Sequence, residues 1–317
     1  MKTRSPRTRR PSRPLRAVGW TAAVAASLLC LASVPSSAAV DGDWLPAGLG
    51  ITSGISGLAV AGATGTGDLL AVHDNKHAGQ RRLSRIQVAG NEAQVWEVRW
   101  DGERLPVDLE ALSDVPGRPG EFVALESSGR AYHLRWASGA ARVLREFTVP
   151  DVAPGDNYEG FALTSSGGRL VAVWAHRGQD EDPGVLATAR LDWATLAFGP
   201  RVSTPVTVPY PGQDVRHVSD VDVTSSGQVV TTAASDPGDD GPFDSAVYDL
   251  GRVTIPAGGE PVLELRAQPL RLGTFAGHKV EGVVCAPGAP STALGSDDEN
   301  LGAAVRRDDL CPSVIAP

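Results

Sequence analysis

The feature that most restricts the fold of this chain is a pattern that recurs five times between residues 55 and 307. Each copy has a short strand with a polar residue near its start, a turn, an apolar strand that ends in polar residues, a second turn and a third strand. The clearest pair is YEGFALTSSGGRL, from Tyr158, and VSDVDVTSSGQVV, from Val218. The polar residues near the five first-strand starts are Ser56, Glu110, Glu159, Ser219 and Glu281.

The spacing of these copies predicts an all-β, five-bladed β-propeller with four-stranded antiparallel blades around a central channel. From one polar position to the next the step is about 50 to 60 residues, which is room for four strands and their turns. After residue 40, Gly and Pro punctuate short β-branched runs, and no segment keeps a helical period over three turns. A β-sandwich explains the strands equally well but leaves the repeat unexplained. The fifth copy has only three strands, and we expect residues 40–52 to supply the fourth.

Residues 1–39 read as a secretory signal peptide, which leaves residues 40–317 as one propeller domain. A basic segment with seven Lys and Arg precedes an apolar run and the small residues PSSAA. An uncleaved membrane anchor is the alternative, but the apolar run is short for a span. The sequence therefore predicts a secreted, extracellular protein without a stable membrane anchor. It does not separate general from twin-arginine export, because Pro11 follows Arg9 and Arg10.

Removal of this segment changes the charge. Residues 1–39 contain seven of the 29 Lys and Arg and none of the 37 Asp and Glu, so 22 basic and 37 acidic residues remain. A net charge of −15 excludes nucleic acid as a partner and favours cations. Two cysteines remain, Cys285 and Cys311. In an exported chain we expect them to form a disulfide, the alternative being two buried thiols. We expect a monomer.

The polar position of the repeat predicts a metal site. First strands line a propeller's channel, so Ser56, Glu110, Glu159, Ser219 and Glu281 should form a ring around the axis. Three facing carboxylates cannot all ionise without a counter-charge. Carboxylates combined with hydroxyls or carbonyls suit Ca²⁺ better than a transition metal. Alternatively, the acids cap turns or bind backbone amides across blades, and Asp220 takes the place of Ser219 after a one-residue shift.

The blade pattern resembles the calcium-activated nucleotidase (apyrase) family, five-bladed propellers whose central Ca²⁺ is held by serines and glutamates of the five innermost strands. ISGLAVAG, YEGFAL, VSDVDV and VEGVV carry the likeness. The esterase-like phytases have strands similar to DLEAL and YEGFAL, so either family is a possible relative. The chain departs from the nucleotidases at HDNK (residues 73–76), where they have an acidic pair followed by arginine, and in the single arginine after His176.

The resemblance implies a Ca²⁺-dependent hydrolase of phosphoanhydrides or phosphate esters, with nucleoside diphosphates as one substrate class. Such chemistry needs cations for the phosphate and an acid or base near the metal. We look for them at the ends of the second strands, beside the channel mouth. The expected catalytic residues are Arg177, His176, Asp74, Asp297 and Asp298. The expected substrate-binding residues are Lys76, Arg130 and Asp236.

Two other functions remain open from the sequence. A non-catalytic propeller would bind protein or glycan through its rim around a structural ion, and its mouth would carry scattered charges. A lactonase-type esterase would use the axial Ca²⁺ as Lewis acid and would need a pocket with apolar walls. Convergence of Arg177 and Lys76 above the ring would favour the phosphohydrolase.

Overall fold

The computed structural model describes residues 43–62, 65–256 and 259–312. The predicted signal peptide and residues 40–42 lie outside this part of the chain. Within it, the only helical segments are two single turns, η1 (Ile51–Ser53) and η2 (Glu299–Leu301). No helix in these residues is long and apolar enough to cross a membrane.

The strands form four hydrogen-bonded sheets, and these divide into the five predicted blades. One sheet of eight strands contains blades 1 and 2, because their outermost strands pair in parallel at residues 99–101 and 140–142, whereas the strands within each blade pair antiparallel. Blade 1 contains β2 (Gly57–Val60), β3 (Asp68–Val72), β4 (Leu83–Ala89) and β5 (Glu92–Asp101). Blade 2 contains β6 (Leu109–Asp114), β7 (Glu121–Glu126), β8 (Arg130–Ala137) and β9 (Ala140–Thr148). Blade 3 contains β10 (Tyr158–Ser166), β11 (Arg169–His176), β12 (Gly184–Asp192), β13 (Ala197–Phe198) and β14 (Val202–Val206). Blade 4 contains β15 (Val215–Val223), β16 (Gln228–Ser235), β17 (Asp244–Thr254) and β18 (Val262–Ala276).

Blade 5 combines strands from both ends of the described chain. Its order is β19 (Val280–Cys285), β20 (Thr292–Ser296), β21 (Ala303–Asp308) and β1 (Leu45–Gly48). Leu45 pairs with Val305 in an antiparallel register. The prediction that residues 40–52 complete this blade is confirmed for residues 45–48.

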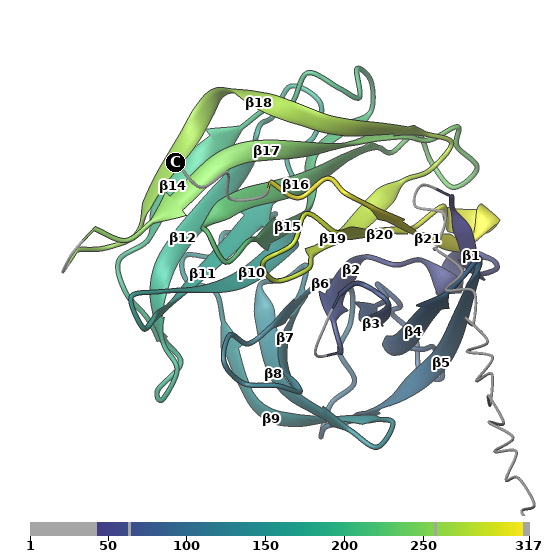
Figure 1. The fold of residues 1–317 in the computed structure, drawn as a ribbon, viewed down its shortest axis with the longest axis horizontal. Helices are drawn as coiled ribbons and strands as arrows, with labels where there is room; N and C mark the ends of the chain where they lie inside the picture. Colours follow the sequence, from purple (N-terminus) through teal and green to yellow (C-terminus); the bar gives the residue numbers. More distant parts are fainter. Residues whose placement is uncertain (1–42, 63–64, 257–258, 313–317) are drawn as a thin grey trace, which may run out of the picture. The chain divides into compact units, whose positions relative to one another are not determined.

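The five blades form a closed ring. Each first strand packs against the first strand of the next blade, in the cyclic order β2, β6, β10, β15, β19 and back to β2. Figure 1 shows these strands in the middle of the fold, with β5, β9 and β18 at the outside. The buried apolar residues fall into five clusters, and each cluster lies between two neighbouring blades. The fold is therefore the predicted five-bladed β-propeller.

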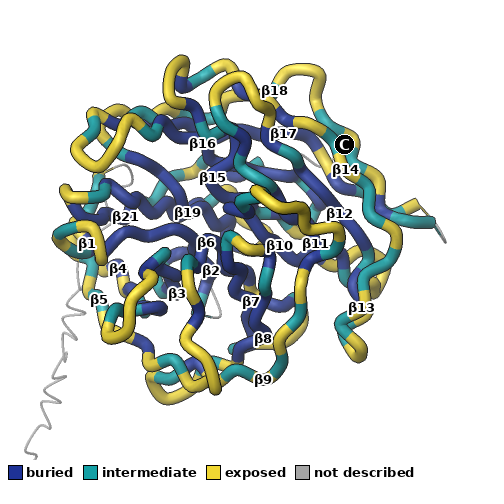
Figure 2. The backbone as a smooth tube through the Cα atoms, turned by 180° about the vertical axis from the view of Figure 1, so that it is seen from behind, coloured by how far each residue is buried: buried dark blue, intermediate teal, exposed yellow. Residues whose placement is uncertain are grey.

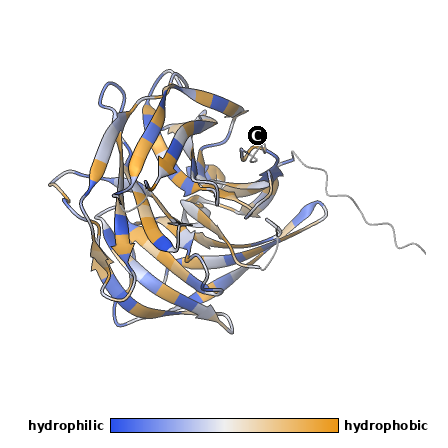
Figure 3. Ribbon diagram, turned by 60° about the vertical axis from the view of Figure 1, so that its left-hand side comes forward, coloured by the Kyte–Doolittle hydropathy of each residue, from blue (hydrophilic) through white to orange (hydrophobic). Residues whose placement is uncertain are grey.

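Burial explains why inner and outer strands differ in sequence. Every residue of β2, β7 and β19 is buried, because both faces of these strands pack against other blades. In β5, β9 and β18 buried or half-buried residues alternate with exposed ones, as expected for a strand with one face in water. Figure 2 shows the buried inner strands and the exposed periphery, and Figure 3 shows hydrophobic and hydrophilic bands alternating along the strands.

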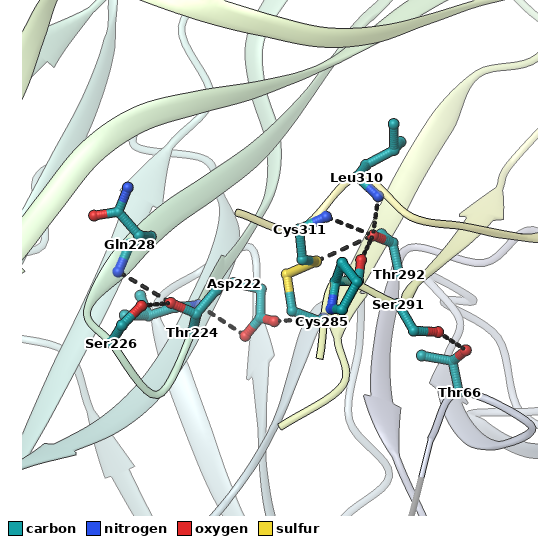
Figure 4. The surroundings of a disulfide bond; sticks show 12 residues. Thr66, Asp222, Thr224, Ser226, Gln228, Cys285, Ser291, Thr292, Leu310 and Cys311 are labelled. Carbon is teal, nitrogen blue, oxygen red and sulfur yellow. Dashed lines mark hydrogen bonds between the residues drawn. A yellow bond between two sulfur atoms is a disulfide. The ribbon is translucent and has the colours of Figure 1, made fainter. Parts of the chain in front are cut away.

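The predicted disulfide between Cys285 and Cys311 is confirmed, and it joins residues 26 positions apart. It ties the segment after β21 to the end of β19. Figure 4 shows Thr292 beside it, donating its hydroxyl hydrogen to Cys311 Sγ over 3.1 Å. Asp222 of the neighbouring blade accepts a hydrogen bond from the Cys285 backbone N–H at 2.7 Å. The disulfide therefore lies at the junction of blades 4 and 5.

Candidate functional site

Each of the five ring residues lies where the first strand of its blade is irregular. In blades 2, 3 and 5, the register between first and second strand shifts across Glu110, Glu159 and Glu281. In blade 4 the shift spans residues 216–220, which include Ser219. In blade 1 the Ser56 N–H binds Val72 O, and Val72 also pairs with Gly57. A β-bulge leaves one residue unpaired and re-aims its side chain. Glu110, Glu159 and Glu281 reach a common cavity from these irregular positions, whereas Ser56 and Ser219 do not line it.

The residue after the ring position is a glycine in blades 1, 3 and 5, because the inner strands approach closely there. A Cβ on Gly57 would lie 2.8 Å from Ala111 Cα of the next blade. A Cβ on Gly160 would lie 2.8 Å from Val221 Cγ2. Both distances are shorter than side chains tolerate, so these glycines allow the ring to be narrow.

A cavity of about 90 Å³ opens at this end of the inner strands. Its lining contains only charged side chains and one amide. Four residues are basic: Lys76, Arg177, Arg216 and Lys279. Seven are acidic: Asp74, Asp108, Glu110, Glu159, Glu281, Asp297 and Glu299, and the amide is Asn157. With all groups ionised the lining carries a net charge of −3, so its acidic groups outnumber its basic groups.

The three ring carboxylates are neutralised unequally. Glu281 Oε1 lies 2.7 Å from Arg216 Nη1 and 3.3 Å from Lys279 Nζ. Glu159 lies 3.4 Å from Arg177 Nη1 and 3.9 Å from Arg216 Nη1. Glu110 is buried as well, but among the described residues no hydrogen bond or ion pair reaches its carboxylate. Glu110 is therefore the ring carboxylate that lacks a counter-charge among the described residues.

The two serines of the ring are also without partners. Ser56 is 1% exposed and Ser219 fully buried, and within the described residues the hydroxyl oxygen of each has no hydrogen-bond partner. A buried hydroxyl without a partner costs about 1–3 kcal/mol. Asp220, the alternative to Ser219, accepts hydrogen bonds from the Val221 and Val283 backbone N–H groups. Of these two neighbouring residues, Ser219 therefore has the oxygen without a hydrogen-bond partner, whereas the Asp220 carboxylate has two donors.

The electrostatics of the cavity favour protonated acids in the absence of further positive charge. Burial, reinforced by the charge of Glu159, holds the pKa of Glu110 well above its usual value. Burial raises the pKa of Glu159 to about 7 even though Arg216 opposes the shift. Burial and then Glu281 raise the pKa of Asp74 to about 6, and the same two causes hold the pKa of Asp297 well above its usual value.

Four of the residues predicted for catalysis or substrate binding line the cavity: Arg177, Asp74, Lys76 and Asp297. Arg177 has the weakest internal interaction of the four basic residues, because its one ion pair within the described residues is the 3.4 Å contact with Glu159. Lys76 Nζ lies 2.8 Å from Asp108 and 3.9 Å from Asp74. Arg177 and Lys76 thus reach the same cavity, as the phosphohydrolase interpretation requires.

The other four do not line the cavity. The Asp298 carboxylate accepts hydrogen bonds from His278 Nδ1, Lys279 N and Ser296 Oγ. The ring nitrogen Nδ1 of His176 accepts a hydrogen bond from the Asn157 backbone N–H at 2.9 Å.

Arg130 and Asp236 are held by other side chains. Arg130 pairs with Glu146 at 3.1 Å on the neighbouring strand. Asp236 binds Arg216 through both Nε, at 3.1 Å, and Nη2, at 2.5 Å. Asp236 therefore holds the Nε and Nη2 side of the Arg216 guanidinium, while Nη1 contacts Glu281.

The sequence analysis missed five lining residues: Asp108, Asn157, Arg216, Lys279 and Glu299. Four of them lie next to a first strand rather than at the end of a second strand. Asp108, Asn157 and Lys279 stand two residues before ring positions, and Arg216 stands three before Ser219. A polar residue two or three positions before each ring residue was the signal that could have identified them.

In the described residues, no three carboxylates, imidazoles or thiolates converge into a ready-made ligand cluster for a metal ion. Arg216 and Lys279 lie against Glu281 instead, so this ring carboxylate already has counter-charges from the protein. The unpartnered Glu110 carboxylate and the two free serine oxygens are ligands of the type that Ca²⁺ prefers.

Comparison with known proteins found no relative in sequence. No protein-family model matches the chain, and no curated protein matches it. Among solved structures, it is similar to a GH43 endo-arabinanase from Bacillus licheniformis, with 12% identity and a TM-score of 0.46 over 81% of this chain and 94% of that one. It is also similar to a glycoside hydrolase, with 14% identity and a TM-score of 0.49 over 83% of this chain. The alignment covers 61% of that glycoside hydrolase. At this level of likeness neither protein assigns an activity or a site residue to this chain.

Proposed function

We propose that this chain is an exported Ca²⁺-dependent hydrolase of phosphate esters or phosphoanhydrides, comparable to the apyrases and the esterase-like phytases. The observation that carries the proposal is the convergence of Arg177 and Lys76 with the three ring carboxylates on one cavity. A phosphate group carries negative charge on several oxygens and needs several cations around it. A divalent cation needs negatively charged oxygen ligands, and here basic and acidic side chains line the same cavity.

The residues divide by role. Glu110, Glu159, Glu281 and the oxygens of Ser56 and Ser219 would hold Ca²⁺, which would supply positive charge to the phosphate and orient a water molecule. Arg177 and Lys76 would bind the phosphate oxygens. Asp74, whose pKa lies near 6, is suited to accept the proton of the attacking water close to neutral pH.

The cavity lining limits the substrate. About 90 Å³ accommodates a phosphate group but not a nucleoside, and no aromatic or aliphatic side chain is present in its described lining to hold a base. Nucleoside diphosphates therefore enter only through their phosphates, and the rest of the substrate lies outside this cavity. The same lining argues against the lactonase alternative, which needs apolar walls.

A glycan substrate is the second candidate, and it is the class that the names of the two similar structures print. Glycoside hydrolysis needs two carboxyl groups, one of them protonated near neutral pH. Asp74 and Glu159 meet the pKa condition. The four basic side chains have no role in that chemistry, however, and they favour a phosphate.

A substrate panel tests the proposal. Purified protein would be assayed for phosphate release from ADP, phytate and p-nitrophenyl phosphate, and for sugar release from arabinan, each with Ca²⁺ and with chelator. We expect Ca²⁺-dependent phosphate release, and we expect Arg177→Ala to lower kcat/KM by about 100-fold or more. Arg130→Ala is the matched control, because Arg130 lies outside the cavity and should leave turnover unchanged. Inertness on every phosphate substrate would leave the non-catalytic binding propeller, and sugar release alone would establish the glycan alternative.

A further inference from the structure

Two of the basic residues of the cavity are each held by two kinds of acid. Arg216 binds the ring carboxylate Glu281 through Nη1 and binds Asp236, outside the ring, through Nε and Nη2. Lys279 likewise contacts Glu281 at 3.3 Å and pairs with Glu299, which is also outside the ring. Arg216 also lies 3.9 Å from the ring carboxylate Glu159. Each of these cations therefore contacts the predicted metal site and also an acid outside it.

The burial of Lys279 makes this arrangement unusual. Its side chain is 1% exposed, although lysine is rarely fully buried without a paired acid. Its ammonium has two acidic partners, Glu281 and Glu299, which compensate for the loss of water around it. A charged ammonium at 3.3 Å from Glu281 supplies the positive charge that a metal ion would otherwise supply to that carboxylate.

We propose that Lys279 and Arg216 exchange partners during function: they neutralise Glu281 in the metal-free protein and bind the substrate phosphate once the ring holds a divalent cation. This inference rests on the proposed function and extends it by two phosphate-binding residues and an order of binding. Two positive charges and a divalent cation repel one another strongly at these distances. The Nη1 group of Arg216 and the ammonium of Lys279 then lose Glu281 as a partner, while Asp236 and Glu299 keep both side chains at the cavity.

The consequence is a positive linkage between metal and phosphate. Without metal, a phosphate must compete with Glu281 for the N–H groups of Arg216 and Lys279. With metal, these N–H groups are free, so the affinity for phosphate rises, and by thermodynamic reciprocity phosphate raises the affinity for the metal by the same factor. Lys76 offers a contrast, since its 2.8 Å partner is Asp108, which is not a ring residue.

Calorimetric titration of the full-length protein with methylphosphonate, a phosphate-like dianion without an ester bond, tests the exchange. We expect saturating Ca²⁺ to tighten methylphosphonate binding about tenfold or more. In Lys279→Met, Ca²⁺ alone should bind several-fold more tightly, because its competitor is gone, and the linkage should fall to about threefold or less. In the control Lys76→Met, methylphosphonate should bind more weakly by the same factor with and without Ca²⁺, so the linkage should persist.

Two outcomes overturn the inference without touching the proposed function. One is equal methylphosphonate affinity with and without Ca²⁺ in the wild-type protein. The other is an unchanged linkage in Lys279→Met, which would mean that the metal contacts the ligand directly. If the wild-type protein binds no Ca²⁺ at all, the proposed function itself fails. Should Lys279→Met fail to fold, the double variant Lys279→Met/Glu299→Gln removes the buried pair together, and the same loss of linkage is expected.

Discussion

Two groups of carboxylates on the inner strands are satisfied differently. Directly after the ring position of blade 4, Asp220 and Asp222 of β15 accept hydrogen bonds from the backbone N–H groups of Val283 and Cys285 on β19. At the cavity end, the hydrogen bonds of the described residues include no backbone donor to Glu110, Glu159 or Glu281. Two of these glutamates contact only charged side chains, and the third contacts none.

The comparison separates acids that hold the blades together from acids that can bind a ligand. A backbone N–H is fixed by its strand, so a carboxylate that binds it joins two blades permanently. A lysine or arginine side chain can move to another anion at little cost to the fold. Burial alone therefore does not mark a functional carboxylate in this protein, whereas the kind of donor does.

Replacing Glu110 by Gln should have the largest effect, because this carboxylate has no internal counter-charge among the described residues. We expect Ca²⁺ affinity to fall at least about tenfold, since ligand charge sets the affinity of such sites. In chelator the same variant should melt at a higher temperature than wild type, because folding then no longer has to bury a carboxyl group whose pKa burial holds well above its usual value. Calorimetric titration and thermal melting measure both effects. Glu146→Gln on β9 serves as the control, and a wild-type Ca²⁺ response in Glu110→Gln would remove Glu110 from the metal site.

For the acids bound by backbone N–H groups, Asp220→Ala should act on stability instead. The change leaves the N–H groups of Val221 and Val283 without their acceptor in a buried setting, which we expect to cost about 2–3 kcal/mol of unfolding free energy. Asp220→Asn keeps one acceptor oxygen and should cost less. Urea unfolding distinguishes the two variants. Equal stability of both variants and the wild type would show that Asp220 does not join blades 4 and 5.

A smaller effect should appear in the pH dependence of stability. Burial raises the pKa of Asp222 to about 6, above the value of about 3.9 in an unfolded chain. Folding therefore favours the protonated form, and the contribution of Asp222 to stability is full below pH 4 and is lost as the pH rises through 6. Because the side chain is partly exposed, we expect about 1 kcal/mol. Asp222→Asn should remove this decline from the urea-unfolding profile between pH 4 and 7, and a profile parallel to wild type would contradict the assignment.

The sequence was sufficient to predict the fold because a propeller repeats its pattern. Five copies of one strand pattern, each with a polar residue at one position, indicated the blades, their order and the blade that takes its fourth strand from residues 40–52. The alignment of Ser219 rather than Asp220 with the glutamates agrees with the bulge in β15. The break in the fourth strand of blade 3 was not predicted: β13 and β14 pair with successive parts of β12, and β13 is only two residues long.

The site was less predictable, because side chains reach the cavity from segments that the repeat does not mark. Arg216 and Lys279 precede the ring positions of their blades, whereas the search covered the ends of second strands. His176 and Asp298 have suitable chemistry and a suitable place in the sequence, yet their polar atoms bind neighbouring groups of the fold. Only coordinates distinguish a carboxylate that faces an opening from one that caps a turn.

The composition of blade 5 has a consequence for how the molecule matures. Strand β1 has no partner until β21 exists, because Leu45 pairs with Val305. In a polypeptide synthesised from its N-terminus, β1 therefore stays unpaired until the strands of blades 1 to 4 and β21 have been made. Glu281 belongs to blade 5, which closes the ring, so an ion that needs all five ring positions has its complete set of ligands only after β1 has paired with β21.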